Sequence, residues 1–424
     1  AAWVNAHPDA TEADVLAWVE TRFGKAEVVK MNPRPTPFAL FGAPETQIPV
    51  NAIEQMETVM RLPMAMAGAL MPDAHLGYAM PIGGVVSLDG AISPSFVGYD
   101  ISCMMQLTLF DITPEAFMAE RAALAEALRS VTAFGVGSDF KPGARKHAVM
   151  DDPLWREIHT LAQLQNKAQR QLGSSGGGNH FADLVVLEFL AEYESYAAGD
   201  VAVALLTHSG SRGTGHNTAV HYVKAAQRMT RHIAKGVPKG YEWLPLDSEA
   251  GQEYLAAMTL MGRYARANHD LIHAYFGVAA GLEPLHRVWN RHNFAWVDEA
   301  GVVIHRKGAT PAAAGQMGII PGSSGTPSYL VRGLGNAASL HSSSHGAGRF
   351  FSRKEANRRH DPRAFARHMA EKDILYFGLK ADETFMAYKD IDMVMRLQNG
   401  VLVEPIARML PRVVIMGGKS DDGD

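Results

Sequence analysis

The cysteine content constrains the fold more than any other feature of the sequence. Cys103 is the only cysteine among 424 residues, so the chain cannot form an internal disulfide. Its fold must therefore be held together by packing, which suits a reducing compartment, and we expect a cytoplasmic protein. Hydrophobic residues make up 47% of the chain and charged residues 20%. These fractions are ordinary for a globular protein and allow a large apolar core.

Two observations argue against a membrane protein. No apolar run reaches the roughly eighteen residues that a transmembrane helix needs. The N-terminal segment AAWVNAHPDATEADVLAWVE lacks a basic stretch followed by an apolar core, so we also expect no targeting segment. The formal net charge of -4 creates no general basic field. A nucleic acid would therefore have to bind a local patch.

Four stretches have the apolar spacing or the capping residues of helices. The first covers residues 11–23, where Thr11 is the expected N-cap and Asp14 completes a capping box. The third ends at Gly173, since glycine most easily takes the left-handed conformation that ends a helix. The second stretch starts at Pro114, and the third covers residues 155–173. The longest stretch covers residues 248–277 and is either continuous or broken in its middle.

Six short apolar runs, mostly bounded by glycine or aspartate, indicate strands. They do not alternate regularly with the helices, which disfavours a doubly wound sheet and favours an α+β fold with a large mixed β-sheet core and surrounding helices. No repeat or linker divides the chain, so we expect one domain over residues 1–424, with an exposed tail at residues 417–424. The runs are GGVVSL (83–88), MMQLTLF (104–110), DLVVLEFL (183–190), VAVALLTHS (201–209), GVVIHRKG (301–308) and RVVIMG (412–417).

Cys103 can serve either packing or chemistry. A free cysteine is more often a small buried hydrophobe, and Cys103 taken alone favours that role. Asp100, three residues earlier, offers a hard oxygen ligand that one loop could present together with the thiol. His180, His208 and His292 stand next to glycines or strand ends and could complete a two-metal site with a bridging thiolate. Each histidine taken alone is better explained as a core residue.

Two motifs rich in glycine and serine carry side chains suited to phosphate. HSGSRGTGH, residues 208–216, combines backbone amides, serine hydroxyls and Arg212. Its alternative is a turn between a strand and a helix with Arg212 on the surface. SSSHGAGR, residues 342–349, places His345 between serines and glycines, with Arg349 close behind. His345 could act there as a nucleophile or a general base.

Three further patterns do not support a site. His269 and His273 have the spacing of a zinc pair but lack the glutamate of the metalloprotease motif, so we interpret them as packing or surface residues. GGKS at 417–420 lacks the first glycine of a P-loop, and no helix follows it. GSSGGG at 173–178 is followed by an expected strand, whereas a dinucleotide fingerprint requires a helix.

The motifs taken together resemble the RtcB family of GTP- and metal-dependent RNA ligases. The ordered set is DxxC, GGGNHF, HSGSRGxGH, HNFA, HRKGAT, PGSxGTxSY and SHGAGR, and the likeness extends from MPDAHLG to AYKDIDMV. This order is highly specific for the family. The resemblance implies a single α+β domain of the family's own kind.

The resemblance also implies roles for individual residues. His345 matches the histidine that attacks the α-phosphate of GTP, forms a covalent histidine-GMP adduct and releases pyrophosphate. Two Mn²⁺ ions would be held by five residues, and Zn²⁺ is a competing ion because thiolate and imidazole ligands usually bind it more tightly. The implied metal ligands are Asp100, Cys103, His180, His208 and His292. The implied nucleotide contacts are Asn179, Phe181, Asp183, Asn293, Pro321, Gly322, Ser323, Ser324, Ser328, Gly346, Ala347, Gly348, Tyr388 and Lys419, and the implied RNA or phosphate contacts are Arg212 and Arg349.

The reaction that the resemblance implies joins two RNA ends. GMP moves to an RNA 3′-phosphate to form an activated RNA-ppG end, a 5′-hydroxyl attacks that end, and GMP leaves; a 2′,3′-cyclic phosphate is first opened by hydrolysis. The expected role is RNA repair or tRNA splicing, with RNA, GTP and an archease-type activator as partners and no membrane. Two alternatives are a metal-dependent phosphodiesterase or phosphatase acting on RNA ends, and a non-catalytic protein that binds RNA ends.

Three positions depart from the family's usual pattern. Asp183 stands where a glutamate is usual, so its contact with guanine would be one methylene shorter. Met104 replaces the glycine that usually follows the metal cysteine, and it places bulk beside the expected ions. At the C-terminal end, either Lys419 or Met416 stands where relatives carry a lysine that reaches the nucleotide.

Overall fold

The computed structural model describes residues 7, 9–11, 13–15, 17–18, 29–234 and 236–418. Its largest element is an eight-stranded sheet in the order β13-β14-β17-β6-β7-β5-β9, with β16 paired to β17. All of these pairings are antiparallel except that of β16 with β17. The strands are β5 (Met104–Phe110), β6 (Phe181–Phe189), β7 (Val201–Ser209), β9 (Pro284–Arg291), β13 (Met317–Ile320), β14 (Ser328–Gly333), β16 (Leu375–Phe377) and β17 (Val403–Met416).

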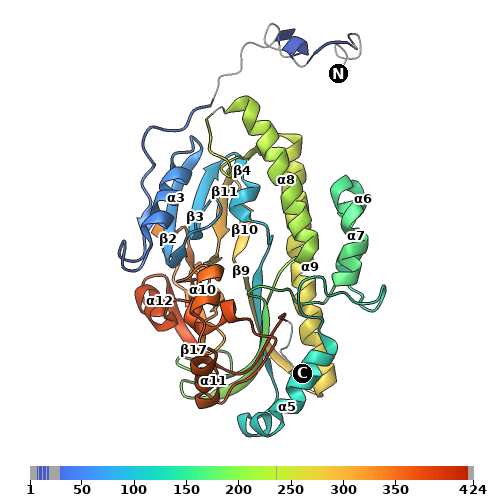
Figure 1. The fold of residues 1–424 in the computed structure, drawn as a ribbon, viewed down its shortest axis with the longest axis vertical. Coiled ribbons are helices and arrows are strands. Elements are labelled where there is room, and N and C mark those ends of the chain that lie inside the picture. Colours follow the sequence, from blue (N-terminus) through green and yellow to red (C-terminus); the bar gives the residue numbers. More distant parts are fainter. Residues whose placement is uncertain are drawn as a thin grey trace.

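A second sheet has five strands in the order β1-β2-β3-β11-β10, and two further pairs join β12 to β15 and β4 to β8. In Figure 1 the second sheet lies beside α3, above the large sheet. The strands are β1 (Ala39–Leu40), β2 (Ala65–His75), β3 (Ile82–Asp89), β4 (Ala91–Ile92), β8 (Leu244–Pro245), β10 (Asn293–Val297), β11 (Val302–Lys307), β12 (Ala309–Pro311) and β15 (Ser342–Ser344).

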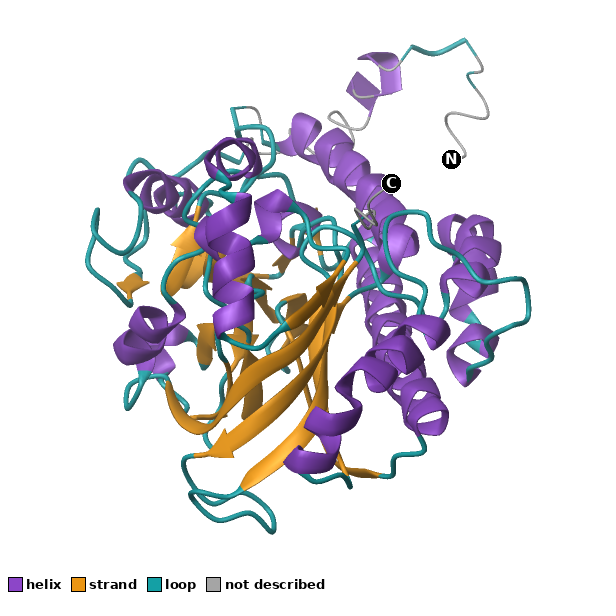
Figure 2. Cartoon of the chain, turned by 60° about the horizontal axis from the view of Figure 1, so that its bottom comes forward, coloured by secondary structure: helices purple, strands orange, loops and turns teal. Residues whose placement is uncertain are grey.

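Two long helices run side by side along the molecule, α8 (Arg212–Ile233) and α9 (Glu249–Ala280) (Figure 1). Helices α9 and α5 (Pro114–Val131) contact one face of the large sheet, and Figure 2 shows helices gathered along that side. The other helices are α3 (Val50–Met60), α4 (Pro94–Val97), α6 (Leu154–Glu157), α7 (His159–Gln171), α10 (Arg353–Arg359), α11 (Pro362–Glu371) and α12 (Ile391–Gln398), with short 3-10 turns η1 (Ala148–Asp151), η2 (Ala337–Ser339), η3 (Ala381–Glu383) and η4 (Phe385–Ala387).

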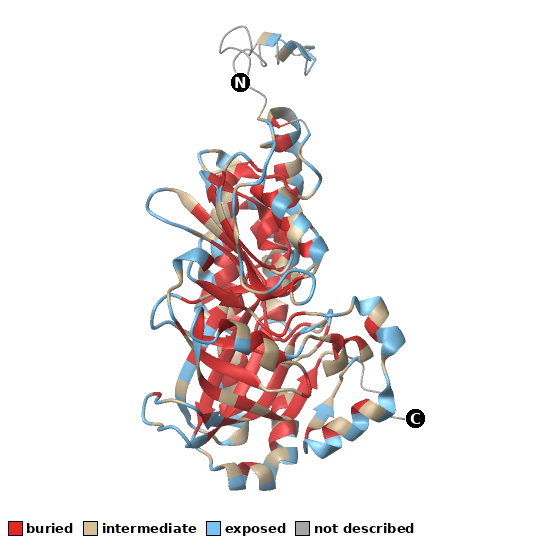
Figure 3. Cartoon of the chain, turned by 90° about the vertical axis from the view of Figure 1, so that its left-hand side faces the viewer, coloured by how far each residue is buried: buried red, intermediate tan, exposed pale blue. Residues whose placement is uncertain are grey.

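The central strands of the large sheet, β5, β6 and β7, are buried on both faces. Strand β13 contacts β9 and β5, so the sheet curls and encloses one apolar cluster that includes Met105, Leu107 and Leu206. The opposite face packs on α5 and α9 through a second cluster that includes Phe110 and Phe276. Every residue of β5 is therefore buried, as expected for a strand covered on both sides. Figure 3 shows this buried interior continuing into the second sheet.

The α+β fold class is confirmed, and all six expected strands are present as β3, β5, β6, β7, β11 and the end of β17. The remaining strands were not expected, and β2 is the longest of them. The sequence of β2, AMAGALMPDAH, is rich in alanine, methionine and glycine, which have little intrinsic preference for strands. Its pairing with β3 and its burial under α3 stabilise it there.

The expected helix starts at Thr11 and Pro114 are confirmed, and the stretch at residues 155–173 differs by one interruption. Thr11 and Asp14 form the capping box through Thr11 N to Asp14 Oδ2 at 2.9 Å, while residues 19–23 of that helix lie outside the described residues. Thr113 caps α5, which starts at Pro114. The stretch at residues 155–173 is interrupted at Ile158 and ends near Gly173, whose φ is +72°.

The longest helix, α9, has 32 residues and no break. The Ser248 side chain caps its first turn by accepting from Gly251 N, and Gly281 ends it with a left-handed φ of 66°. The first two residues of the expected tail, Gly417 and Gly418, are half-buried, and residues 419–424 lie outside the described range. Within the described part of the chain, none of the helices combines the length and apolar character that a bilayer span requires.

Candidate functional site

Four neighbouring strands bring the expected metal ligands to one edge of the large sheet. His180 immediately precedes β6, His208 lies at the end of β7, Cys103 precedes β5 and His292 follows β9. Because adjacent antiparallel strands begin and end alternately at the same edge, these four side chains meet. The sheet order β6-β7-β5-β9, not sequence proximity, creates the cluster.

Asp100 reaches the cluster from the tight turn that precedes β5. Ser102 has a left-handed φ of 59°, and its backbone N donates to the carbonyl of Asn293 at 2.7 Å. The carbonyl of Ile101 accepts from Ser211 Oγ at 2.5 Å. These contacts fix the turn, and the Oδ2 atom of Asp100 lies 2.8 Å from Nε2 of His180.

The ligand atoms form two groups that share the thiol. Cys103 Sγ lies 3.3 Å from His180 Nε2 and 3.0 Å from His208 Nε2, and His208 Nε2 lies 3.1 Å from His292 Nε2. One group is Asp100, Cys103 and His180; the other is Cys103, His208 and His292. Sulfur, nitrogen and carboxylate atoms that converge in this way offer more lone pairs than protons, so the donor set fits cations.

Burial controls the charge of these ligands. It lowers the pKa of His208 and of His292 well below the usual value, and neighbouring histidines lower both further, so both imidazoles are neutral as metal ligands must be. Burial and then the Asp100 charge raise the pKa of the Cys103 thiol well above its usual value. Although burial opposes it, the adjacent His180 lowers the pKa of Asp100. A cation between these groups would favour the thiolate.

A contact behind the cluster fixes the orientation of His208. Its Nδ1 atom lies 2.9 Å from the carbonyl oxygen of Asn179. A carbonyl can only accept, so Nδ1 carries the proton and the Nε2 lone pair faces Cys103 and His292. Partners of this kind hold metal-ligating histidines in one tautomer.

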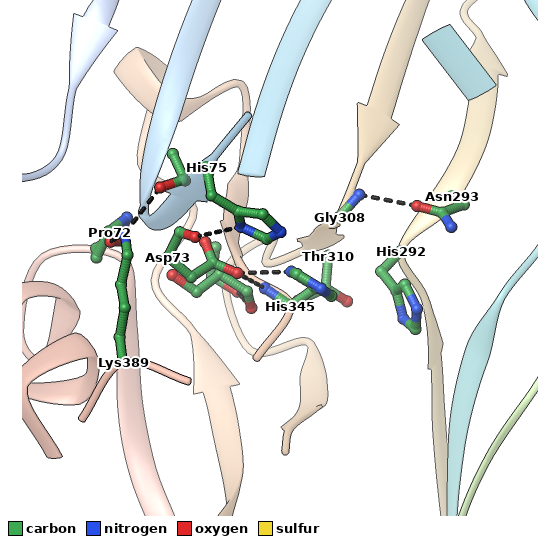
Figure 4. A network of polar contacts seen from close by, with 12 residues as sticks. Pro72, Asp73, His75, His292, Asn293, Gly308, Thr310, His345 and Lys389 are labelled. Carbon is green, nitrogen blue, oxygen red and sulfur yellow. Dashed lines mark hydrogen bonds and ion pairs between the residues drawn. The ribbon is translucent and has the colours of Figure 1, made fainter. Parts of the chain in front are cut away.

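His345 stands next to the cluster but is held by a different residue. Its ring centroid lies 5.2 Å from that of His292. Asp73 Oδ2 accepts from both Nδ1 of His345, at 2.6 Å, and its backbone N, at 3.2 Å. Figure 4 shows His345 between Asp73 and His292, with Gly308 beside it. With Nδ1 bonded to the carboxylate, Nε2 of His345 is the nitrogen left for chemistry.

Two glycines permit this arrangement. A Cβ on Gly308 would lie 2.2 Å from Ile82 Cγ2 and 3.1 Å from Cε1 of His345, and a Cβ on Gly348 would lie 2.2 Å from the carbonyl oxygen of Asp73. Both residues also have positive φ, 59° and 74°. The chain therefore passes close to the imidazole and to the Asp73 loop only because no side chain is present.

Asp73 is a site residue that the sequence reasoning missed. It is fully buried, and although burial opposes it, the His345 charge and hydrogen bond lower the pKa of the carboxyl. Lys389 holds its loop by donating to the carbonyls of Gln47, Pro72 and Ala74 (Figure 4). The available signal was the motif MPDAHLG, which places an aspartate and a histidine beside glycine.

The expected nucleotide contacts lie on segments around His345 and His180. Gly346 borders the loop between β13 and β14. A Cβ added at Gly346 would lie 3.2 Å from the Pro321 carbonyl oxygen. Within that loop Gly322 N donates to Ser328 Oγ, Ser323 N donates to Thr326 Oγ1, and Ser324 Oγ donates to the Glu383 carbonyl. Elsewhere, Phe181 contacts the His208 ring, Asn293 accepts from Gly308 N, Ala347 is buried, and Lys419 lies outside the described residues.

Asp183, on β6, is buried, and its Oδ1 atom has no hydrogen-bond partner in the structure. Burial raises the pKa of its carboxyl well above the usual value. A buried, unpartnered carboxyl oxygen is costly unless a ligand supplies a donor. One oxygen of the Asp183 carboxyl is therefore free to accept a hydrogen bond.

The two expected phosphate-binding arginines have different surroundings. Arg349 donates to Tyr388 Oη, Glu383 Oε2 and the carbonyl of Asp382, which ties the end of the SSSHGAGR motif to the segment that carries Tyr388. Arg212 is buried, so the alternative of a surface position is wrong. Its Nε donates to Ser174 Oγ at 3.0 Å and an Nη donates to the Gly135 carbonyl at 2.9 Å.

His269 and His273 are packing residues. Both are buried under the large sheet, where Thr207 Oγ1 lies 2.6 Å from His269 Nδ1 and 2.8 Å from His273 Nε2. They form a polar network inside the core and belong to neither of the two ligand groups.

Comparisons with known proteins identify the family of the chain. The family model described as tRNA-splicing ligase RtcB matches residues 55–417. The chain is 31% identical to the RNA-splicing ligase RtcB of Mycobacterium tuberculosis, over 86% of this chain and 100% of that protein. It is 31% identical to the tRNA-splicing ligase RtcB of Thermococcus kodakarensis, over 87% and 91% of the two chains, and 30% identical to the RNA-splicing ligase RtcB of Escherichia coli K12, over 87% and 95%. The chain therefore belongs to the RtcB family of RNA-splicing ligases.

Proposed function

We propose that the chain is a GTP-dependent ligase that joins RNA 3′-phosphate or 2′,3′-cyclic phosphate ends to 5′-hydroxyl ends through a covalent His345-GMP intermediate. Family membership supports the RNA ligase class. The observation that carries the finer proposal is the Asp73–His345 contact beside the cluster of metal-ligand residues. RNA repair or tRNA splicing is the proposed role, and an archease-type activator is a proposed partner.

His345 has the tautomer that a phosphorus nucleophile needs. With the proton of Nδ1 directed at Asp73, the Nε2 lone pair attacks the α-phosphate of GTP, an N–P bond forms, and the P–O bond to pyrophosphate breaks. The imidazole then carries a positive charge, which the buried Asp73 carboxylate offsets without having to take the proton. The labile N–P bond lets GMP pass to an RNA 3′-phosphate, and the 5′-hydroxyl then displaces GMP.

The five cluster residues would hold two divalent cations, and Cys103 belongs to both groups of candidate ligands. Bound there, the ions would neutralise charge on the phosphates and orient the leaving group. Mn²⁺ is the proposed ion by family resemblance, and Zn²⁺ is the expected competitor because of the sulfur and nitrogen ligands.

Several residues are proposed to hold the nucleotide. The unpartnered Oδ1 atom of Asp183 supports a contact with the donor groups of guanine, and Ser328 and Tyr388 would lie near the base. Asn179, Ala347 and Gly348 would lie near the phosphate and ribose. Met104 is buried and directly follows Cys103, at the position where the family resemblance implies glycine.

Labelling with GTP tests the proposal. Incubation with Mn²⁺ and GTP labelled at the α-phosphate should attach the label to the protein, and His345→Ala should abolish it. A wild-type protein that stays unlabelled with Mn²⁺, Zn²⁺ and Mg²⁺ would refute the ligase mechanism. The cluster is complete without His345, which favours one second candidate, a metal-dependent phosphodiesterase on RNA ends; its activity would persist in His345→Ala and ignore GTP.

A further inference from the structure

We propose that Tyr78, Tyr99 and His216 form a platform on which bases of the RNA stack beside the reacting end. This inference rests on the proposed function, because it assigns the RNA-binding surface of the same site. The three rings come from three distant segments: the loop between β2 and β3, the turn after α4, and the start of α8.

The ring of Tyr99 contacts both of the other rings. The ring centroids of Tyr78 and Tyr99 lie 6.5 Å apart with their planes at 82°, an edge-to-face pair. The centroids of Tyr99 and His216 lie 5.6 Å apart with their planes at 36°. All three residues are nevertheless exposed, Tyr78 to 91% and Tyr99 to 40% of the residue surface. A contiguous group of exposed aromatic rings on a folded protein is typical of a binding surface.

The backbone beneath Tyr78 is fixed, so its exposure does not result from a loose loop. Gln55 makes two hydrogen bonds to Gly77, with Nε2 donating to the carbonyl at 2.8 Å and Oε1 accepting from the backbone N at 2.9 Å. Tyr241 Oη donates to the carbonyl of Ala79 at 3.2 Å. A ring displayed on a fixed backbone loses little conformational entropy when a ligand stacks on it.

The platform adjoins both parts of the candidate site. Tyr99 directly precedes Asp100, whose carboxylate lies in the cluster. The loop of Tyr78 follows β2, which ends at His75. Asp73, the residue that holds His345, lies two residues before that end. An RNA strand whose end lies at His345 and the cluster would therefore place its last bases next to these rings.

The platform also gives a use to parts of three motifs that the proposed catalysis leaves unused. Tyr78 belongs to MPDAHLGYAM, Tyr99 to VGYDISC and His216 to HSGSRGTGH. Other residues of each motif lie in the cluster or beside His345, while these rings face solvent. Aromatic stacking tolerates any sequence because every base has a π face, which suits an enzyme that binds ends and not a fixed sequence.

A binding experiment with matched RNAs tests the platform. The probe is a fluorescent single-stranded RNA with a 3′-phosphate, measured without GTP at fixed salt, together with copies that carry one abasic site at each of the last three nucleotides. Tyr78→Leu should bind the intact RNA between about 5-fold and 100-fold more weakly than wild type, the usual range for one stacked base. Tyr78→Phe, which keeps the ring, should bind within about 2-fold of wild type, and thermal unfolding should show that both variants are folded.

The abasic copies separate stacking from a structural effect. One abasic position should weaken binding to the wild type and cause no further loss in Tyr78→Leu, because the base and the ring act as a pair. Equal abasic penalties in wild type and Tyr78→Leu, or unchanged affinity of Tyr78→Leu for the intact RNA, would overturn the platform. Binding is measured without GTP, so failure of wild type to accept GMP would count against the ligase mechanism alone.

Discussion

His345 and Asp73 are 272 residues apart in the chain, yet Nδ1 of His345 lies 2.6 Å from Oδ2 of Asp73. The same carboxylate oxygen accepts from the backbone N of His345, so both the ring and the main chain are held. Asp73 therefore sets the tautomer and the direction of the imidazole. In this respect it resembles the aspartate of a hydrolase triad, which orients its histidine without becoming protonated.

Replacing this carboxylate should disable His345, the proposed nucleophile, without unfolding the site. In Asp73→Asn, the amide can donate to Nδ1 of His345, which moves the proton to Nε2 and removes the attacking lone pair. We expect the rate of labelling by GTP to fall by about 10²- to 10⁴-fold, by analogy with tautomer-disrupting changes in triads. Metal content should match wild type, because Asp73 belongs to neither ligand group. Labelling of Asp73→Asn at the wild-type rate would show that Asp73 has no such role.

Cys103 and His292 should differ in how much metal they retain. Cys103 belongs to both ligand groups, whereas His292 belongs to one. Cys103→Ala should therefore lose both ions and His292→Ala about one, measured as bound metal per chain by elemental analysis after dialysis. Ser102→Ala, a buried neighbour whose hydroxyl has no partner in the structure, is the matched control and should keep the wild-type content. Equal losses in the two ligand variants would mean that the thiol serves one ion.

Sequence patterns predicted the parts of this site that depend on local features. The strands β5, β6 and β7 have apolar runs bounded by glycine or aspartate, and Cys103, His180 and His208 stand at the ends of those runs. Chemistry-bearing residues at strand ends are visible without a structure. The strand order that makes these ends meet was not visible, because it depends on pairing between segments far apart in the chain.

The residues that sequence reasoning missed act through distant contacts. Asp73 lies in β2, whose alanine- and methionine-rich sequence gave no strand signal, and its partner His345 directly follows β15, which belongs to another sheet. Glu383, in the short 3-10 turn η3, accepts hydrogen bonds from the side chains of Arg349 and Tyr388. Neither residue stands in a pattern that predicts its partner, because sheet register and side-chain packing determine both contacts.

The buried network beneath the sheet should contribute to stability. Thr207 supplies one hydroxyl to two buried imidazoles, and His273 Nδ1 also lies 2.7 Å from Thr108 Oγ1. Thr207→Val keeps the shape but leaves His269 Nδ1 and His273 Nε2 without this partner. We expect the free energy of unfolding to fall by about 1–3 kcal/mol, measured in urea. Thr207→Ser retains the hydroxyl and should lose less than half of that amount; equal losses in the two variants would assign the effect to packing.

His305 should make stability depend on pH. It is fully buried, its Nε2 accepts from Ser93 N at 3.0 Å, and Nδ1 donates to the Val303 carbonyl at 3.2 Å, so both nitrogens are used in the neutral form. Burial lowers the pKa of His305 from 6.5 to about 3, although its backbone hydrogen bonds oppose this. The imidazole of His305 therefore binds a proton near pH 6.5 in the unfolded chain but only near pH 3 in the folded chain. Stability is lost as the pH falls below 6.5.

Between pH 7 and pH 5 this one group should remove about 2 kcal/mol from the free energy of unfolding. His305→Gln can still accept from Ser93 N but does not titrate, so it should lose about 2 kcal/mol less than wild type over the same interval. The difference between the two proteins isolates His305, because the candidate metal ligands and the other buried histidines, such as His75 and His269, are present in both. Urea unfolding curves at pH 7, 6 and 5 give the comparison, and parallel pH dependences would show that His305 is not the source of the acid sensitivity.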